Sequence, residues 1–338
     1  MQRPALRHRP LDLKLRHAFG LSRGTWDSRK NLLVELDDGR HVGLGEAAPI
    51  ARYGQDQESS RRAVEEMHAR LGDPRAFAVE AARVAVPGQA AAQAALDIAL
   101  HDLAGKRLGA PLYELLGVDR TGAPETSFTI GLDTPEKVVA KVREASAYPI
   151  LKVKMGSDAD RAVLEAVRDT TRQRLRVDAN EGWTLEGALE RLEWLERLGV
   201  EMVEQPLPAD QIEQTRELRK RSPLPIWADE SVHGPEDVPR LAGAFDGINI
   251  KLMKCGGVAA ALRLIAVARA HGLQVMLGCM IETAIGITAA AHLSPLVDTA
   301  DLDGNLLLEH DPFEGVTLRD GRLVLPEGPG LGVKLRAD

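Results

Sequence analysis

Eight short apolar runs rich in β-branched residues recur from residue 126 onward and constrain the fold more than any other feature. The runs are 126–130, 151–155, 175–179, 201–205, 225–229, 248–252, 274–278 and 299–303. Near its end each run carries one polar or small residue, and these residues repeat at intervals of 22 to 27 positions. Such an interval holds a strand, a loop and a three-turn helix, which is the repeat of a parallel βα unit. Eight such units predict an α/β barrel.

The chain before the barrel has a different pattern and predicts a smaller α+β unit. Residues 31–36 and 41–46 flank Asp37-Asp38-Gly39, a sequence typical of a hairpin turn. An amphipathic helix is expected over 57–71. A second helix, over 88–104, is apolar on nearly all sides and is therefore expected to be buried.

Composition excludes several classes of protein. Hydrophobic residues make up 44% of the 338 positions and charged residues 28%, and the formal net charge is -7 without a basic block. These values favour a soluble protein with no nucleic-acid or membrane partner. The N-terminus lacks the apolar stretch of a secretory signal, and Cys255 and Cys279 are too few for a disulfide framework. A cytoplasmic location is expected.

An open doubly wound sheet that binds a dinucleotide is the alternative fold. Gly43-Leu44-Gly45 imitates the glycine-rich phosphate turn of that fold. It follows a hairpin, however, and Pro49 interrupts any helix after it. The barrel is the favoured interpretation.

Three carboxylates come from consecutive predicted strands: Asp178, Glu204 and Asp229. The carboxyl ends of barrel strands meet on the face that carries active sites. Three converging carboxylates repel one another unless a divalent cation lies between them. An all-oxygen set without His or Cys favours Mg²⁺, with Mn²⁺ as a substitute, over zinc. Three unrelated helix caps or ion pairs are the alternative, which the matched positions disfavour.

Three lysines are expected beside this metal site. Lys152 and Lys154 lie two apart on one strand and so point to the same face. Lys251 enters from the sixth strand, across the barrel. Adjacent ammonium groups near a metal are expected to depress each other's pKa, so that Lys154 serves as a base. A substrate carbon between Lys154 and Lys251 would have one lysine on each face.

These groups predict proton transfer next to a substrate carboxylate. A divalent cation stabilises the enediolate that forms when the neighbouring carbon loses its proton. One lysine removes the proton and the opposite lysine returns it on the other face. The expected outcome is racemisation or epimerisation.

The same residues belong to five short motifs: Lys152-Val153-Lys154, Asp178-Ala179-Asn180, Glu204-Gln205-Pro206, Asp229-Glu230-Ser231 and Asn249-Ile250-Lys251. In this order the motifs resemble the muconate-lactonising branch of the enolase superfamily, in which a Lys or His base works with Mg²⁺. The likeness covers nearly the whole chain, including a closing Gly328-Pro329-Gly330-Leu331-Gly332. It implies a capping domain over 1–122, a modified (β/α)7β barrel over 123–310 and a segment over 311–338 that returns to the capping domain.

The resemblance also implies a role for each residue of the site. Asp178, Glu204 and Asp229 would bind Mg²⁺, and Lys154 and Lys251 would be the acid and base. Lys152 would then lie by the substrate carboxylate and tune its neighbour Lys154.

Two further segments are similar to the dipeptide epimerases, in particular those acting on L-Ala-D/L-Glu. Asp301 and Asp303 are expected to point inward, and the one predicted metal ion is already bound by the other three carboxylates. The pair therefore suits a cationic group of the substrate. In dipeptide epimerases this motif holds the substrate's α-ammonium. The segment 277–283 is similar to the seventh-strand segment of dipeptide epimerases. By this likeness backbone groups there, at Cys279 and Met280, would hydrogen-bond the peptide. Cys279 is expected to pack rather than to act as a nucleophile.

Specificity is expected from capping-domain loops over 17–29 and 49–57. By the likeness, Arg23 would bind a γ-carboxylate, and Arg52 and Tyr53 would line the mouth of the site. The resemblance therefore implies an enzyme that inverts the α-carbon of the C-terminal residue of a dipeptide.

Other functions remain open at this point. An N-acylamino-acid racemase, an o-succinylbenzoate synthase or a cycloisomerase would use the same scaffold, but their substrates lack the ammonium that Asp301 and Asp303 suit. A non-catalytic metal-binding scaffold would need no paired lysines. A homo-oligomer is compatible with the sequence, which does not decide the oligomeric state.

Overall fold

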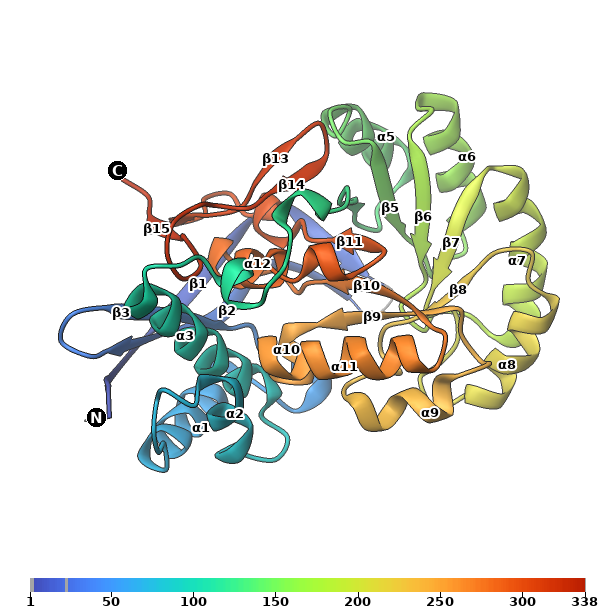
Figure 1. Ribbon diagram of the computed structural model, residues 1–338. Coiled ribbons are helices and arrows are strands. Elements are labelled where there is room, and N and C mark those ends of the chain that lie inside the picture. Colours follow the sequence, from blue (N-terminus) through green and yellow to red (C-terminus); the bar gives the residue numbers. More distant parts are fainter. Residues whose placement is uncertain (1–2, 22–23, 338) are drawn as a thin grey trace.

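The computed structural model describes residues 3–21 and 24–337, in which a small sheet with its helices lies beside a barrel (Figure 1). The small sheet is antiparallel, in the order β1 (Ala5–Leu21), β2 (Gly24–Asp37) and β3 (Val42–Ala47). Leu36 of β2 pairs with Gly43 of β3, so the predicted hairpin is confirmed. The long strand β1 extends the sheet on the other side of β2.

Four helices follow this sheet: α1 (Gln57–Ala69), α2 (Phe77–Arg83), α3 (Ala90–Leu108) and α4 (Leu112–Leu115). The two predicted helices correspond to α1 and to the buried α3. A Cβ added at Gly43 would lie 2.2 Å from the Ala99 carbonyl oxygen, and one at Gly45 would lie 2.0 Å from that of Ala95. The glycine run therefore lets α3 approach β3 closely, and this packing explains the resemblance to a phosphate turn.

The barrel consists of eight parallel strands, and each predicted run overlaps one of them, with bounds that differ by no more than two residues at either end. In chain order they are β4 (Phe128–Ile130), β5 (Ile150–Lys154), β6 (Arg174–Asp178), β7 (Val200–Glu204), β8 (Ile226–Ala228), β9 (Gly247–Lys251), β10 (Gln274–Gly278) and β11 (Thr299–Asp301). Neighbours in sequence are neighbours in the sheet. A parallel bridge between Thr126 and Ala300 brings the first and last strands together.

Helices cover the outside of the barrel (Figure 1). They are α5 (Pro135–Glu144), α6 (Asp160–Thr170), α7 (Leu185–Arg197), α8 (Ile212–Arg221), α9 (Val238–Leu241), α10 (Leu252–Cys255), α11 (Val258–Ala270) and α12 (Ala284–Ala291). After β11 the chain forms only a 3₁₀ turn over Gly304–Leu307, so the eighth strand lacks the usual helix. This is the (β/α)7β arrangement that the resemblance implied.

The last residues run back to the first helices. They contain the short strands β12 (Phe313–Glu314), β13 (Thr317–Arg319), β14 (Arg322–Val324) and β15 (Lys334–Leu335). The Leu331 amide donates to Asp102 Oδ1 of α3 at 2.8 Å, and the Leu112 amide of α4 donates to the Gly330 carbonyl at 2.8 Å. No helix among the described residues combines the length and apolar character needed to cross a bilayer.

Candidate active site

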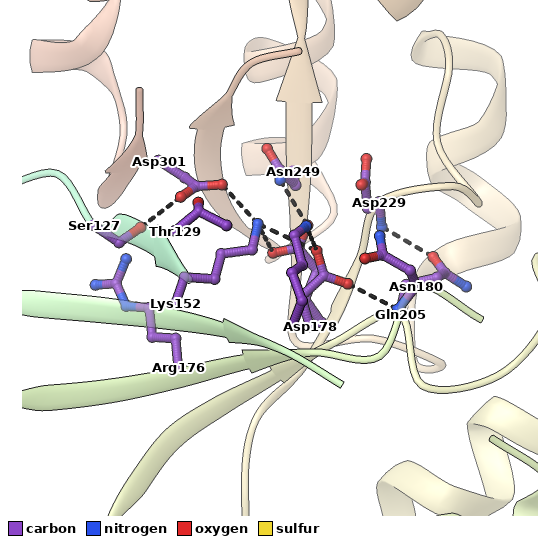
Figure 2. A network of polar contacts seen from close by, with 12 residues as sticks. Ser127, Thr129, Lys152, Arg176, Asp178, Asn180, Gln205, Asp229, Asn249 and Asp301 are labelled. Carbon is purple, nitrogen blue, oxygen red and sulfur yellow. Dashed lines mark hydrogen bonds and ion pairs between the residues drawn. The ribbon is translucent and has the colours of Figure 1, made fainter. Parts of the chain in front are cut away.

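The three predicted metal ligands converge at the carboxyl ends of neighbouring strands. Asp178 ends β6, Glu204 ends β7, and Asp229 directly follows β8. All three side chains are buried, and one carboxylate oxygen from each lies within 4.8 Å of the others. Figure 2 shows Asp178 and Asp229 within the polar network that surrounds this point.

The electrostatics of this acidic triad fit a divalent cation. Burial and the neighbouring Asp178 raise the pKa of Glu204 to about 7. Asn249 Nδ2 donates to Glu204 Oε1 at 2.8 Å, and the buried Glu204 Oε2 lies 2.8 Å from Lys152 Nζ. Three buried carboxylates within 4.8 Å of one another repel, and a bound cation relieves this repulsion. Because every ligand is an oxygen, the set suits Mg²⁺.

Backbone turns just after the strands hold the triad in place. Asn180 has φ 44° and Gln205 has φ 35°, in the left-handed region that non-glycine residues rarely adopt. The Asn180 amide donates to Asp178 Oδ1 at 2.9 Å, and Gln205 Oε1 accepts from the Asp229 amide at 2.9 Å. Asn180 thus holds the carboxylate of Asp178, and Gln205 holds the backbone of Asp229. Residues in such strained backbone conformations often occur at functional sites.

Lys154 and Lys251 approach the triad from different strands. Lys154 Nζ lies 2.7 Å from Asp178 Oδ2 and Lys251 Nζ lies 2.8 Å from Asp229 Oδ2. Lys154 ends β5 and Lys251 ends β9, with three strands of the barrel between them. Both lysines are buried and both line one cavity of about 310 Å³. For Lys251, burial lowers the pKa, but the carboxylates of Asp229 and Glu204 together raise it, and the net shift is upward.

Lys152 corrects one expectation from the sequence. Its Nζ lies 2.6 Å from Asp301 Oδ2, 2.8 Å from Glu204 Oε2 and 3.3 Å from Asp178 Oδ2. Burial lowers the pKa of Lys152, but these carboxylates raise it well above its usual value. The prediction that Lys152 and Lys154 depress each other's pKa is therefore wrong for Lys152. In Figure 2 its ammonium lies between Asp178 and Asp301.

Lys254 is a part of the site that the sequence analysis missed. It lies on α10, just beyond β9, and its Nζ is 2.5 Å from Asp229 Oδ1. The same ammonium also contacts the Asp229 carbonyl oxygen. Lys254 follows Lys251 by three residues and lies at the start of a helix. This position is the sequence feature from which its place in the site could have been predicted. Asp229 is therefore held by one lysine on each carboxylate oxygen.

The aspartates at the end of β11 have different surroundings. Asp301 accepts from Ser127 Oγ at 2.6 Å and from Lys152 at 2.6 Å, so its charge is already compensated. Asp303 Oδ2 accepts from the Thr129 amide at 2.5 Å. Burial and Asp301 raise the pKa of Asp303 to about 6. The sequence suggested that Asp301 and Asp303 together form a site for a cationic group. In the structure Asp301 is paired with Lys152, and Asp303 has no cationic partner among the described residues.

Most of the predicted substrate-binding residues line the same cavity: Tyr53, Lys152, Cys279, Met280, Asp301 and Asp303. Cys279 Sγ contacts the Asp301 carbonyl oxygen at 3.3 Å, and burial raises the pKa of its thiol, which agrees with a packing role. Tyr53 packs edge-on against His233 at 4.9 Å. Arg52 lines the cavity but forms an ion pair with Glu181. Arg23 lies outside the described residues.

Two family descriptions match the chain. Residues 8–117 match the mandelate racemase / muconate lactonizing enzyme N-terminal domain, and residues 136–338 match the enolase C-terminal domain-like family. Together they cover most of the sequence.

Individual relatives and structures are similar over almost their entire lengths. The chain is 43% identical to an L-Ala-D/L-Glu epimerase of Bacteroides thetaiotaomicron, over 96% of this chain and 86% of that protein. It is 42% identical to an L-Ala-D/L-amino acid epimerase of Pedosphaera parvula, over 97% of this chain and 98% of that protein. A dipeptide epimerase structure from Cytophaga hutchinsonii, complexed with Mg and D-Ala-L-Val, matches with a TM-score of 0.94 and 28% identity, covering 100% of this chain and 97% of that one.

Proposed function

The chain belongs to the enolase superfamily, within its mandelate racemase and muconate lactonizing enzyme group, and we propose that it is a Mg²⁺-dependent dipeptide epimerase. It inverts the α-carbon of the C-terminal residue because one lysine removes the α-proton and the other lysine donates a proton of its own to the opposite face. The preferred substrate is of the L-Ala-D/L-Glu type. Residues 1–122 act as the capping domain of a barrel over 123–310, and 311–338 return to the cap.

The observation that carries this proposal is the arrangement of Lys154 and Lys251. They extend from opposite sides of the barrel into one cavity, and each is bound to a carboxylate of the acidic triad. A carbon held between their Nζ atoms has an amine on each face. Lys154 removes or returns a proton on one face and Lys251 does so on the other, so the configuration inverts.

The acidic triad holds the metal. Asp178, Glu204 and Asp229 supply only oxygen ligands and would hold Mg²⁺, which would supply electrostatic stabilisation for the negative charge of the substrate carboxylate when its neighbouring carbon loses a proton. Lys152, buried between Glu204 and Asp301, which raise its pKa, adds positive charge at the same point. Lys254 keeps Asp229 in position.

The free ammonium of the dipeptide binds at the end of β11. Asp303 is buried, lines the cavity and lacks a cationic partner among the described residues. An ammonium group beside it relieves the repulsion between Asp303 and Asp301. Substrates of N-acylamino-acid racemases and o-succinylbenzoate synthases carry no such ammonium and would leave Asp303 uncompensated.

Incubation with L-Ala-L-Glu in D₂O with Mg²⁺ tests the proposal. The expected result is deuterium at the C-terminal α-carbon together with the D-epimer, both seen by NMR. Lys154→Gln and Lys251→Gln each lower epimerisation by at least roughly 100-fold, because one face loses its proton donor or acceptor. Each variant retains exchange with one epimer only, because the remaining lysine still serves its own face.

Lys220→Gln, at an exposed lysine of α8, is the matched control and keeps full activity. Faster exchange of N-acetyl-amino acids than of any dipeptide would instead favour the N-acylamino-acid racemase reaction. Absence of exchange in both substrate classes would contradict proton transfer by this site.

A further inference from the structure

Arg29 reaches the cavity from the capping sheet. Arg29 and Asn31 lie two residues apart on β2, so their side chains share a face. Asn31 Nδ2 donates to the Ile281 carbonyl oxygen at 3.0 Å, and Ile281 lines the cavity. On the adjacent strand Arg29 pairs with Leu13, which is buried. Arg29 accordingly points toward the mouth of the barrel, where it lines the same cavity as the two lysines of proton transfer.

The guanidinium of Arg29 is partly desolvated and forms no ion pair with any carboxylate of the described residues. Its Cζ lies 4.5 Å from the centre of the Trp26 ring, so the group stacks on an aromatic face. Arg29 Nε is buried and donates to no acceptor within residues 3–21 and 24–337. Burial lowers the pKa of Arg29, yet an arginine keeps its charge at any working pH. A buried donor of this kind is costly until an acceptor arrives.

The other cations of the cavity are neutralised within the protein. The ion pairs are Lys152 with Asp301, Lys154 with Asp178, Lys251 with Asp229 and Arg52 with Glu181. Among the described residues that line the cavity, Arg29 is thus the cation left without a counter-ion. The surrounding wall is apolar, formed by Phe19, Leu21, Trp26 and Ile50.

We propose that Arg29 binds a carboxylate on the side chain of the substrate's C-terminal residue. A carboxylate forms charge-assisted, bidentate hydrogen bonds with a guanidinium, and the apolar wall around Arg29 strengthens them. A neutral or basic side chain leaves the guanidinium unpaired or repelled. The inference rests on the proposed dipeptide epimerase function, and it assigns to Arg29 the selection of glutamate or aspartate that the sequence had suggested for Arg23.

Paired substrates that differ only in charge test this assignment. The values of kcat/KM for L-Ala-L-Glu and the isosteric L-Ala-L-Gln are measured by α-deuterium exchange with Mg²⁺, and the affinities of both by calorimetry. The unaltered enzyme prefers L-Ala-L-Glu by at least about tenfold, the size expected of a charge-assisted hydrogen bond. Arg29→Gln reduces the preference to near unity while activity toward L-Ala-L-Gln persists, and Arg29→Glu shifts the preference to L-Ala-L-Lys.

Two further variants separate recognition from structure. Arg29→Lys keeps the charge and restores part of the preference, which a merely structural arginine would not predict. Lys30→Gln, at the exposed neighbour on the opposite face of β2, leaves the preference unchanged.

The inference is overturned if the unaltered enzyme treats the two substrates alike, or if folded Arg29→Gln keeps the preference and Arg23→Gln removes it. If no dipeptide undergoes exchange at all, the proposed function fails, and calorimetry still decides the role of Arg29 through the difference in affinity between the two dipeptides.

Discussion

Asp301 and Asp303 show how two identical side chains, two residues apart, acquire different properties. Asp301 is bound to Lys152 and Ser127, and so it belongs to the charge network that surrounds the metal ligands. Asp303 receives a backbone hydrogen bond from Thr129 but no cation among the described residues. A substitution at Asp301 would therefore also disturb Lys152, whereas Asp303 reports on ammonium binding more directly.

Asp303→Asn is predicted to raise KM for dipeptides by at least about tenfold with a smaller effect on kcat, because it removes a charge-assisted contact to the substrate ammonium.

The pKa of Asp303 is raised to about 6 in the free enzyme, so this carboxylate is ionised above pH 6 and loses its charge below it. The ratio of kcat/KM for L-Ala-L-Glu to that for its N-acetyl derivative should therefore decrease as the pH falls through about 6. Steady-state assays between pH 5 and 8 measure this ratio.

The control for Asp303→Asn is Asp158→Asn, at an exposed aspartate in the loop after β5. It should leave both KM and the pH profile unchanged. An unaltered KM in folded Asp303→Asn would show that the ammonium binds elsewhere.

The sequence predicted most of the site because its members follow a strict rule of position. Asp178, Glu204 and Lys251 end strands, and strand ends of a barrel meet on one face. The charge states were not predictable in this way, because they depend on distances between strands. Lys152 has a raised pKa since three carboxylates lie within 3.3 Å of its Nζ, and no pattern within one strand contains that information.

At the scale of elements, Glu46 joins strand β3 to helix α12. The fully buried carboxylate accepts from Asn31 Nδ2 at 2.8 Å, from the Thr283 amide at 3.0 Å and from Thr283 Oγ1 at 2.6 Å. Thr283 is the N-cap of α12, and the loop before it lines the cavity through Cys279 and Met280. Glu46 thus fixes a wall of the cavity to the capping sheet.

Glu46→Ala is predicted to lower the free energy of unfolding by about 3 kcal/mol or more, because several buried donors lose their acceptor at once. KM for the dipeptide should rise as well, since the loop containing Met280 loses its anchor. Urea denaturation followed by circular dichroism measures the first effect, and steady-state kinetics the second.

Glu35→Ala is the matched control for Glu46. Glu35 lies on the adjacent strand β2, is partly exposed and forms only a 3.5 Å ion pair with Arg7, so its removal should cost less than about 1 kcal/mol. Equal losses of stability in the two variants would contradict a special role for Glu46.

The elements themselves were predictable to different degrees. The eight barrel runs were identified because buried parallel strands are continuous apolar segments between helices. The long strand β1 has alternating exposed and buried residues over only part of its length, and a register shift between Lys14 and Phe19 interrupts it. The contact between Glu46 and Thr283 spans 237 positions of the chain, so no local periodicity predicts it.

At the scale of the whole molecule, His292 lies where three parts of the chain meet. It follows α12 of the barrel, its ring stacks on Tyr113 of α4 at 5.7 Å, and its Nε2 donates to the Leu331 carbonyl oxygen at 3.1 Å. The side chain is fully buried. Burial lowers the pKa of His292 to about 4, although the bond to Leu331 opposes this shift. The folded protein therefore requires a neutral ring at this junction.

The stability of the molecule should depend on this histidine in acid. Its pKa is lower in the folded chain than the ordinary value of about 6.5, so its contribution is complete above pH 6.5 and is lost as the pH falls toward 4. Lowering this pKa from 6.5 to about 4 corresponds to about 3 kcal/mol. His292→Gln keeps a donor for Leu331 but cannot titrate. The free energy of unfolding of this variant should therefore decrease less steeply than that of the unaltered protein between pH 6.5 and 4.

Urea denaturation across this pH range measures how the free energy of unfolding of each protein depends on pH. The control is His271→Gln, at an exposed histidine, which should show the same dependence as the unaltered protein. Parallel slopes for the unaltered protein and His292→Gln would show that acid destabilises this junction through other groups.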